Sequence, residues 1–468
     1  MKLEIANKIR VYSPPEILKE RWIRQLKIKN PEYVEAQMAG RSTWDVPEFI
    51  YNFVTTPDGG LLVPRGIRHQ LLEDAEREGV KVDLIDNRTL FPYIEVDIDT
   101  IKYRPYQFDS VMKLVTVPEG VLVSPAGSGK TVVGLSLIPI TGQPTLWLTH
   151  TGPLAKQAIT RAEEFLPNIG KIGFIGSGKW VKGEILTVAM VQTLIRNIDK
   201  TVEMQNDFGL VVLDEAHHCP ASTFLNVVSR FNPFFLYGLT ATPYRRDKLE
   251  ILMFQTLGQN KTIINVGDVG EQMIVPKIKV RPVYHDHVAY PDDLQYIIKH
   301  YVVENKARNA TIVADVLKEA EMGKSCLVVS DRKVHCENLY DLLKKKWKKT
   351  GIVTGDYKKS HIDEEIRKTN EKETTILVAT YSLFGEGTDI PVLERAFVAM
   401  PFRSKAKVVQ LVGRVQRSAA GKKDAIVYDY VDVGVGILEN QFHNSDILKE
   451  SRMRGYESIG AEIEKCNN

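Results

Sequence analysis

Hydrophobic and polar positions follow one repeating pattern through most of this chain. From about residue 100 onward, short apolar runs alternate with longer segments in which apolar residues recur at helical spacing. The apolar runs form two series: Gly120–Ser124, Thr145–Thr149, Leu186–Val188, Leu210–Leu213 and Phe235–Leu239, then Ser325–Val329, Gly351–Thr354, Thr375–Ala379, Arg395–Ala399 and Ala425–Asp429. Such alternation is typical of parallel sheets covered by helices on both faces. The pattern therefore predicts an α/β protein with two tandem parallel-sheet domains.

The first 98 residues follow a different pattern, which combines a helix with a hairpin. Pro14–Ile28 has the periodicity of an amphipathic helix. Its apolar face is formed by Leu18, Trp22 and Leu26, and its basic face by Arg21, Arg24 and Lys27. Phe49–Thr55 and Leu61–Pro64 flank the sequence Pro-Asp-Gly-Gly at Pro57–Gly60, which predicts a hairpin turn. We expect a small α+β N-terminal accessory domain over residues 1–98.

These patterns give a predicted order of domains. The first parallel-sheet domain covers residues 99–265 and the second covers residues 301–435. Residues 266–300 have no regular pattern and are predicted to be a connector. Residues 436–468 are predicted to form helices that pack on the second domain. The length of 468 residues also suggests about three domains.

Composition narrows the class of protein only a little. With 43% hydrophobic and 26% charged residues, the chain is ordinary for a soluble globular protein. No apolar run approaches the roughly 18 residues that span a bilayer, and the N-terminus lacks the apolar core of a signal peptide. The four cysteines show no CxxC spacing, so neither a zinc site nor a disulfide framework is indicated. We expect a cytoplasmic protein with no membrane partner.

Charge is more informative in its distribution than in its total. The net charge of +3 is too small to indicate a nucleic-acid-binding protein. Residues 1–30, however, carry eight lysines and arginines against three glutamates, whereas residues 65–98 carry five against eight acidic residues. The basic arm at the N-terminus either binds duplex or junction DNA or is a solvated face, and the sequence leaves both open.

The sequence SPAGSGKT at Ser124–Thr131 has the composition of a phosphate-binding loop. It follows an apolar run and precedes a helical segment, so its backbone amides can hold phosphate oxygens at a helix N-terminus. The loop residues are Pro125, Ala126, Gly127, Ser128 and Gly129. We expect Lys130 to reach the β- and γ-phosphates of ATP and the Thr131 hydroxyl to bind Mg²⁺. A strict GxxxxGK[ST] pattern fails at Ser124.

A second glycine-rich sequence, GFIGSGKW at Gly173–Trp180, nearly matches the same pattern. Trp180 stands where a hydroxyl would have to bind magnesium, and an indole cannot do so. We therefore interpret this copy as a turn.

Asp214 and Glu215 directly follow the apolar run Leu210–Leu213. The carboxyl end of a strand is where open α/β sheets place ligands. Asp214 is then the predicted magnesium partner, and Glu215 the predicted base that orients the attacking water. His217 and its two neighbours, His218 and Cys219, do not suit one tetrahedral zinc ion, because adjacent positions on a turn do not converge.

Far downstream, QLVGRVQR contains Gln410, Arg414 and Arg417. Two guanidinium groups from the second domain could reach the γ-phosphate only when that domain closes on the first. Such arginine fingers are worth about 10³–10⁵ in rate. The alternative is two ordinary surface arginines. An ATP site built from two domains predicts a nucleic-acid motor rather than a kinase.

Taken together, these motifs resemble superfamily 2 helicases and translocases over residues 100–435. The resemblance implies two RecA-like domains that use ATP and Mg²⁺. It assigns Arg104 and Gln107 to adenine recognition, and Gly387 and Asp389 to the nucleotide. It assigns nucleic-acid contacts to Thr149, His150, Thr151, Gln192, Thr193, Ser330, Arg332 and Thr380. It assigns coupling between the two sites to His217, Thr240 and Thr242.

Within that superfamily, the chain looks most like the phage UvsW-type and XPB-like DNA helicases. The opening KLEIANKIRVYSPP, the FGEGTDIP form of one motif and the compact second domain carry this resemblance. It implies a DNA helicase acting on single-stranded, forked or branched DNA, with RNA a weaker candidate because QLVGR begins with glutamine rather than histidine. It also implies a monomer, possible replication or recombination partners in its pathway, and a host cytoplasm for a phage protein.

Three alternatives stay open from the sequence. The protein could be an RNA helicase, a double-stranded DNA translocase that does not separate strands, or an ATP-gated clamp that binds nucleic acid without moving. The basic sequence KKKWKK at Lys344–Lys349 has two readings as well. It is either a patch that stacks on a base or, as we favour, a solvated helix end with Trp347 packed inward.

Overall fold

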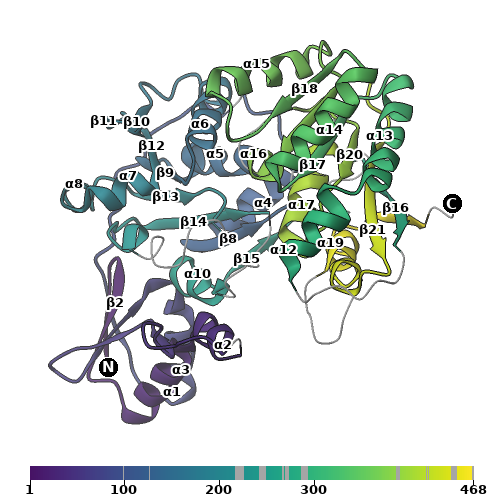
Figure 1. Cartoon of the computed structure of the whole chain (residues 1–468). Helices are drawn as coiled ribbons and strands as arrows, with labels where there is room; N and C mark the ends of the chain where they lie inside the picture. The colour runs from purple at the N-terminus through teal and green to yellow at the C-terminus, as the bar shows by residue number, and fades with distance from the viewer. Residues whose placement is uncertain are drawn as a thin grey trace. The chain divides into compact units, whose positions relative to one another are not determined.

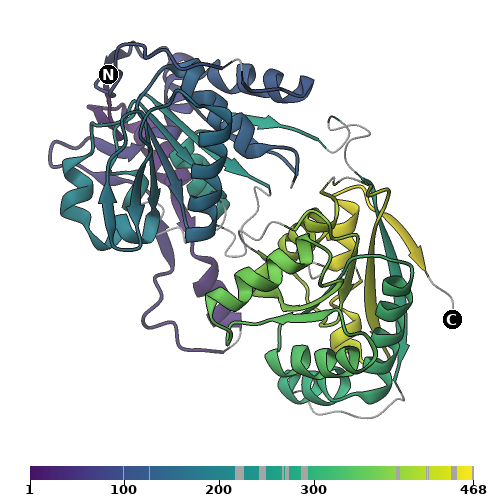
Figure 2. The same cartoon turned by 90° about the horizontal axis from the view of Figure 1, so that it is seen from above.

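The computed structural model describes residues 1–38, 40–98, 100–125, 127–216, 226–241, 249–265, 268, 274–285, 293–385, 390–417, 419, 421–443 and 451–465. The chain forms two compact units. One comprises Met1–Ser124 and Gly129–Ile264, and the other comprises Pro125–Ser128 and Asn265–Asn468. In Figures 1 and 2, the large sheet of each unit is flanked by helices.

The N-terminal region has its own five-stranded sheet, in the order β5-β6-β2-β1-β7. Its strands are β1 (Lys2–Ile5), β2 (Lys8–Tyr12), β5 (Val54–Thr55), β6 (Leu61–Pro64) and β7 (Asp83–Asp86). Alternate residues of β1 and β2 face a core shared with α1 (Glu16–Leu26) and α3 (Arg68–Arg77). Leu18, Trp22 and Leu26 are buried in that core, so the predicted amphipathic helix is confirmed.

The predicted hairpin is confirmed only in its second half. β5 and β6 pair antiparallel across the Pro-Asp-Gly-Gly turn. The residues just before them form a separate strand, β4 (Phe49–Tyr51), which pairs with β3 (Lys27–Lys29) instead. Between those two strands lies α2 (Pro31–Met38).

The N-terminal region is packed on the first α/β sheet rather than standing apart from it. The Arg65 side chain, which follows β6 in the short helix η1 (Arg65–Ile67), is 2% exposed and forms an ion pair with Glu119, with Nη2 and Oε2 3.1 Å apart. Arg68 contacts the other oxygen of the same carboxylate at 2.9 Å. Gly66 lies so close to Gly258 that a Cβ would stand 2.4 Å from the backbone nitrogen. Because Glu119 opens a strand of the first α/β sheet, a buried ion pair joins this sheet to the N-terminal region.

The first α/β sheet has the order β11-β10-β12-β9-β13-β14-β8-β15. Its strands are β8 (Glu119–Val123), β9 (Thr145–Thr149), β10 (Gly173–Gly176), β11 (Lys179–Val181), β12 (Leu186–Met190), β13 (Leu210–Leu213), β14 (Phe235–Thr240) and β15 (Lys261–Ile263). All neighbours pair in parallel except β10 and β11. The β10–β11 hairpin turns at Ser177 and Gly178, which have φ of 50° and 80°. The rejected phosphate-loop copy is therefore a turn.

Helices cover both faces of this sheet. The helices around the sheet are α4 (Pro105–Val115), α5 (Lys130–Thr141), α6 (Gly152–Phe165), α7 (Val191–Arg196), α8 (Ile198–Glu203) and α10 (Glu250–Leu257). Helix α5 lies directly on one face, where a Cβ at Gly134 would meet Leu239 and Trp147. The opposite face forms a core with α7 and α10. This arrangement confirms the predicted parallel-sheet domain.

The second α/β sheet has the order β18-β19-β17-β20-β21-β16-β22. Its strands are β16 (Pro276–Tyr284), β17 (Cys326–Ser330), β18 (Thr350–Val353), β19 (Ile376–Thr380), β20 (Arg395–Val398), β21 (Ala425–Val433) and β22 (Glu462–Lys465). One face packs on α13 (Lys306–Glu321) and α14 (Lys333–Lys346), and the other on α17 (Lys405–Val415) and α19 (Arg452–Glu457). The remaining helices are α12 (Leu294–Ile297), α15 (Lys359–Asn370), α16 (Tyr381–Gly385) and α18 (Gly436–Glu439).

At the ends of this domain, the predicted connector was wrong, and the predicted C-terminal helices are present as α18 and α19 but are not the whole of residues 436–468. Strand β16 lies inside the predicted connector 266–300, yet it pairs with β21 along its whole length. Its two prolines are compatible with this position, because Pro276 opens the strand and Pro282 lies beyond the stretch that pairs with β22. In the predicted C-terminal helices, β22 instead adds a short edge strand.

Smaller predictions can be compared with the structure too. The Trp347 indole donates to Thr375 Oγ1 at 2.8 Å and packs against the core, which confirms the inward-packed reading of KKKWKK. The described cysteines, Cys326 and Cys336, are buried thiols. Within the described ranges, no helix is long and apolar enough to span a bilayer.

Candidate ATP site and nucleic-acid contacts

The predicted phosphate loop leaves the carboxyl end of β8 and enters α5. The Ser124 amide donates to the Thr240 carbonyl at 2.9 Å, which joins the start of the loop to the end of β14. Gly127 and Gly129 have φ of 83° and 88°, a conformation that strongly favours glycine. Helix α5 then begins at Lys130, so the loop amides lie at a helix N-terminus. Ala126 lies outside the described residues.

Gln107 lies against this loop. Its Oε1 accepts the Arg104 amide at 2.9 Å, which caps the N-terminus of α4, and the side chain is 3% exposed. A Cβ at Gly129 would stand 2.2 Å from Gln107 Nε2, so only glycine fits beside the amide. The predicted adenine-recognition residue is therefore next to the phosphate loop. Its side-chain oxygen is already a hydrogen-bond acceptor for the N-terminus of α4.

The predicted catalytic acids meet Lys130 at the end of β13. Lys130 Nζ and Glu215 Oε1 are 3.5 Å apart. Asp214 Oδ1 accepts the Glu215 amide at 3.0 Å. Glu215 has a φ of 49°, which is uncommon for a residue with a Cβ and typical of functional sites. Sequence spacing and the fold therefore agree on one cluster of a lysine and two carboxylates.

The pKa of the buried Asp214 carboxyl is raised above its ordinary value. Burial, and after it the adjacent Glu215 charge, raise this pKa to about 7 against the opposing influence of Lys130 and His150. A divalent cation would reverse this shift, because it is the largest charge such a site can hold.

Mg²⁺ commonly uses one or two carboxylates together with substrate phosphates and water. Asp214 and the half-buried Thr131 in the first turn of α5 fit that donor set. No cluster of three or more His, Cys, Asp or Glu side chains occurs in the described part of the chain. His217, with His218 and Cys219, lies outside the described residues.

The remaining predicted residues of the first domain share this edge of the sheet. Thr149 ends β9 and pairs in register with Met190, which ends β12. His150 and Thr151 follow β9, and Gln192 and Thr193 follow β12 in α7. In the sheet order, β9 lies between β12 and β13, so the predicted nucleic-acid contacts adjoin the acidic cluster. Thr240 is buried at the end of β14, and Thr242 lies outside the described residues.

The second domain places its predicted contacts in the same way. Ser330 ends β17 and pairs in register with Thr380, which ends β19. The Arg332 amide donates to Ser330 Oγ at 3.2 Å. The Thr380 hydroxyl is buried and has no hydrogen-bond partner among the described residues. Gly387 and Asp389 lie outside the described residues.

Gln410, Arg414 and Arg417 lie on one face of α17 and its continuation. They are half-buried, whereas Val408, Leu411, Val412 and Val415 on the other face enter the core. Burial raises the pKa of the nearby Tyr381 hydroxyl, and the Arg414 charge opposes this change. The same hydroxyl donates to the Lys407 carbonyl. The predicted arginines therefore share one side of a helix that is fixed by its apolar face.

Sequence reasoning missed the residues that support these predicted contacts. Lys422 Nζ donates to the carbonyls of Arg417 at 2.8 Å and Pro391 at 3.3 Å, and also to Leu393. His335 Nδ1 lies 3.1 Å from Ser330 Oγ. No local spacing signals such contacts, although a lysine soon after the arginine motif could have drawn attention.

Comparisons with known proteins agree with this geometry. A family model described as "Type III restriction enzyme, res subunit" matches residues 100–245, and one described as "Helicase conserved C-terminal domain" matches residues 308–419. Together they cover just over half of the chain. The chain belongs to the superfamily 2 helicases.

Within that class, the chain is similar to phage helicases and to XPB-like helicases. It is 25% identical over 382 residues to "Probable helicase D10" of Escherichia phage T5, covering 78% of each chain. It is 26% identical over 416 residues to "DNA 3'-5' translocase XPB2" of Sulfurisphaera tokodaii, covering 79% of this chain and 89% of the relative. It is 23% identical over 352 residues to "ATP-dependent DNA helicase uvsW" of Enterobacteria phage T4, covering 70% and 68%.

A solved structure shares the fold of the two RecA-like domains. S. cerevisiae Dbp5, in a structure titled as bound to RNA and ADP BeF3, aligns with a TM-score of 0.55 at 15% identity. The alignment covers 78% of this chain and 90% of that chain. At this identity the likeness concerns the fold alone.

Proposed function

We propose that the protein hydrolyses ATP to translocate on DNA and to unwind or remodel forked or branched DNA. One observation carries the proposal. Lys130, Asp214 and Glu215 gather at the carboxyl edge of a parallel sheet, directly beside the ends of β9 and β12, where the predicted nucleic-acid contacts lie. Hydrolysis at one part of this edge can therefore be coupled to binding at the other.

The residues of the site have separable roles in this proposal. Lys130 neutralises phosphate charge, and the loop amides orient the phosphates. Glu215 positions the attacking water and accepts its proton. When ATP and Mg²⁺ are bound, they supply the transferable phosphoryl group and its counter-charge. Asp214 and Thr131 would hold the ion.

Movement follows if ATP favours a closed arrangement of the two domains. Arg414 and Arg417 then complete the site, and the phosphate contacts of one domain shift along the strand relative to those of the other. Contacts to phosphates rather than bases would give sequence-independent binding that weakens with salt. Motion is thus a consequence of closure that depends on the nucleotide.

DNA is the proposed substrate because of the relatives. The printed names of the Sulfurisphaera tokodaii and phage T4 relatives specify DNA. Another relative, "Putative ATP-dependent RNA helicase L396" of Acanthamoeba polyphaga mimivirus, is 28% identical over 331 residues and specifies RNA. An RNA helicase is therefore the second candidate.

Steady-state ATP hydrolysis distinguishes these candidates. It would be measured without nucleic acid and with single-stranded, forked and duplex DNA and RNA, beside an inactive Lys130→Ala control. We expect strong stimulation by forked or single-stranded DNA and little by RNA. Stimulation by RNA alone would contradict the DNA proposal.

Strand displacement on a labelled fork then separates a helicase from the two non-unwinding alternatives. We expect ATP-dependent displacement that Lys130→Ala abolishes. A duplex translocase would hydrolyse ATP rapidly on duplex DNA without displacing a strand. A clamp would turn over ATP slowly and displace nothing.

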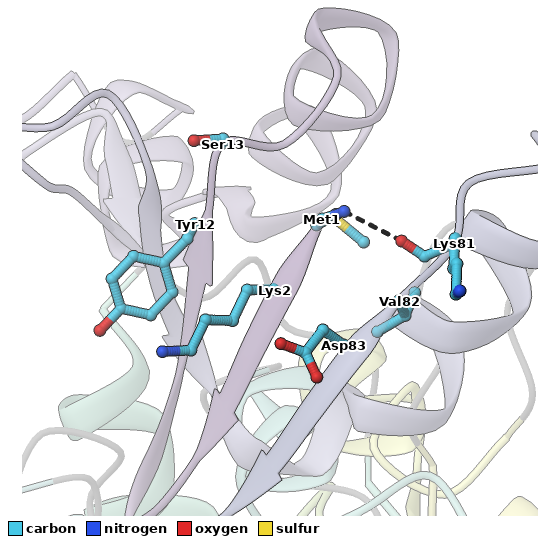
Figure 3. Close-up of a pocket in the computed structure, with 7 residues that line it drawn as sticks. All are labelled: Met1, Lys2, Tyr12, Ser13, Lys81, Val82 and Asp83. Atoms are coloured by element: carbon cyan, nitrogen blue, oxygen red, sulfur yellow. Dashed lines mark hydrogen bonds between the residues drawn. The ribbon is translucent and has the colours of Figure 1, made fainter.

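The N-terminal region is a candidate surface for duplex or forked DNA. Figure 3 shows an open depression on its sheet, where Lys2 and Tyr12 lie near the loop that carries Lys81. Lys2 Nζ is 5.0 Å from the Tyr12 ring centre, and the N-terminal ammonium donates to the Lys81 carbonyl. Of the eight basic residues in 1–30, Arg10, Arg21 and Lys29 already pair with acids. The candidate surface is therefore smaller than the whole basic arm.

Deleting residues 1–98 would be a poor test, because it removes the buried Arg65 partner of Glu119. A double variant, Lys2→Glu with Lys81→Glu, keeps that contact. We expect it to weaken binding of forked or duplex DNA more than binding of single strands, whereas Arg24→Glu on α1 has little effect. Equal losses on all substrates would refute a specific role for this surface.

A further inference from the structure

A π-helical turn lies beside the predicted nucleic-acid contacts of the second domain. It is η3 (Ile298–Val303), which continues directly from α12. π-Helices are rare, and they occur frequently at functional sites. This turn packs against α13 and α14 and is outside every motif that the resemblance assigns.

A buried chain of hydrogen bonds connects the turn to Ser330. Asn309 Nδ2 donates to the Val303 carbonyl at 2.9 Å, so its Oδ1 faces His335 Nε2, also at 2.9 Å. His335 Nε2 must then carry the hydrogen, which leaves Nδ1 to accept the Ser330 hydroxyl at 3.1 Å. Burial lowers the pKa of His335 to about 3, so the ring is neutral.

A second connection ties α12 to the same loop. Arg332 donates through Nη2 to Gln295 Oε1. The segment from Gln295 to Val303 is thus held at both ends: Arg332, in the loop that follows β17, bonds Gln295, and Asn309 of α13 bonds Val303. Its position relative to Ser330 and Thr380 is fixed by side chains rather than by chance packing.

Between this segment and the start of α14 lies an open groove of about 570 Å³. Its apolar wall contains Ile298, Val303 and Val334, and its cationic rim contains Lys299, Arg332 and Lys333. Lys299 and Lys333 are 62% and 50% exposed, and Val334 is 59% exposed. Two of these lysines face acids: Lys299 Nζ lies 3.7 Å from Glu304 Oε1, and Lys333 pairs with Asp356. The other acid of the groove, Asp331, lies 2.8 Å from Lys407, so a phosphate would have to compete with Glu304 for Lys299.

We propose that this groove carries single-stranded DNA onward from Ser330 and Thr380, with Lys299 contacting a phosphate. The proposal rests on the proposed function and names a further part of its DNA path. A cationic rim beside an exposed apolar wall suits a strand whose backbone is charged and whose bases are uncovered. Duplex DNA presents no such apolar surface along its backbone.

Salt dependence of binding tests the proposal with Lys299→Ala. Binding of a fluorescent oligothymidine would be measured by anisotropy over a range of salt concentrations. Losing one phosphate contact should make the slope of log K against log salt shallower by about 0.7, and weaken binding about fivefold at roughly 0.1 M salt. The matched control is Lys318→Ala, an exposed lysine at the other end of α13, whose slope should equal that of the wild type.

The outcomes separate this proposal from the proposed function. If the wild-type protein binds no DNA, the proposed function fails. If it binds DNA but Lys299→Ala keeps the wild-type affinity and slope, only the groove is refuted. Equal effects of Lys299→Ala and Lys318→Ala, or a loss confined to duplex DNA, would refute the groove as well. Thermal unfolding of both variants shows whether they remain folded.

Discussion

Asp214 of the first α/β domain and Asp432 of the second are both buried near the end of a parallel strand, but their neighbours differ. Asp432 faces Arg308, with Oδ1 and Nε 2.8 Å apart, and His285 at 3.0 Å. Burial alone would raise the pKa of Asp432, yet Arg308 and His285 outweigh it and the pKa falls below its ordinary value. Asp214 lies beside Glu215 instead, and its pKa is raised to about 7.

The difference extends to the arginines of the second domain. Inside its core, Arg308 and Arg452 are fully buried and form ion pairs with Asp432 and Asp429. The arginines of α17, in contrast, lie half-buried on the face that its valines and leucines leave outside the core. Removing one partner of a buried ion pair leaves an uncompensated charge in the core, whereas the half-buried arginines of α17 are the ones that we propose for a ligand.

This comparison predicts the largest effect for Arg414→Ala. If the α17 arginines serve the nucleotide rather than the fold, the variant should lose about 10³–10⁵-fold in turnover while it still binds ATP and remains folded. Single-turnover hydrolysis and binding of a fluorescent ATP analogue measure the two properties separately. Arg367→Ala, which removes an exposed arginine paired with Glu364 on α15, is the matched control and should hydrolyse ATP normally. Unchanged turnover in Arg414→Ala would refute a two-domain site.

The sequence predicted the strand ends of the two α/β sheets well, because a strand end is recognised from the apolar run just before it. Every predicted strand of the two α/β sheets has a counterpart in the structure, with ends shifted by four residues at most. Asp214 directly follows the apolar run Leu210–Leu213, so the end of that run predicted that its carboxylate lies at the edge of the sheet. Thr149, Ser330 and Thr380 are the last residues of their strands, so the ends of the apolar runs also predicted the position of their hydroxyls at a sheet edge.

The sequence could not predict what depends on contacts between distant residues. Strand β16 lies in a predicted connector because its sequence has no regular pattern, and pairing with β21 and β22 explains why it is a strand. Arg308 meets Asp432 across more than a hundred residues, and nothing in their local sequence links them. The packing of the N-terminal region on the first sheet through Arg65 and Glu119 is of the same kind.

The paired charges provide the second prediction. Arg308→Met leaves the Asp432 carboxylate buried without its arginine partner, and should lower the free energy of unfolding by roughly 3–5 kcal/mol. Urea denaturation measures this loss. Arg367→Met breaks an exposed ion pair in the same domain and should cost far less, because solvent screens exposed charges. Equal costs for the two variants would contradict the distinction between buried and exposed charge.

Lys422 lies between the two cases, the buried arginines that form ion pairs and the half-buried arginines of α17. Its ammonium is half-buried and donates to the backbone carbonyls of Pro391 and Leu393, which precede the arginine motif, and of Arg417, which ends it. Burial lowers its pKa to about 8; Glu394 opposes this change, and Arg417 adds to it. An ammonium group that donates to backbone carbonyls rather than to a carboxylate therefore loses its proton at a lower pH.

The smallest predicted effect is a pH dependence of stability. Between pH 8 and the ordinary lysine pKa of 10.5, the folded protein releases the Lys422 proton while the unfolded chain keeps it. The unfolded state then binds more protons, so this group makes the free energy of unfolding rise with pH in that window. The wild type should gain stability relative to Lys422→Met above pH 8 in urea denaturation, whereas Lys423→Met, at the exposed neighbour, should follow the wild type. A difference that stays constant or falls with pH would show that Lys422 keeps its proton, as a fully paired lysine would.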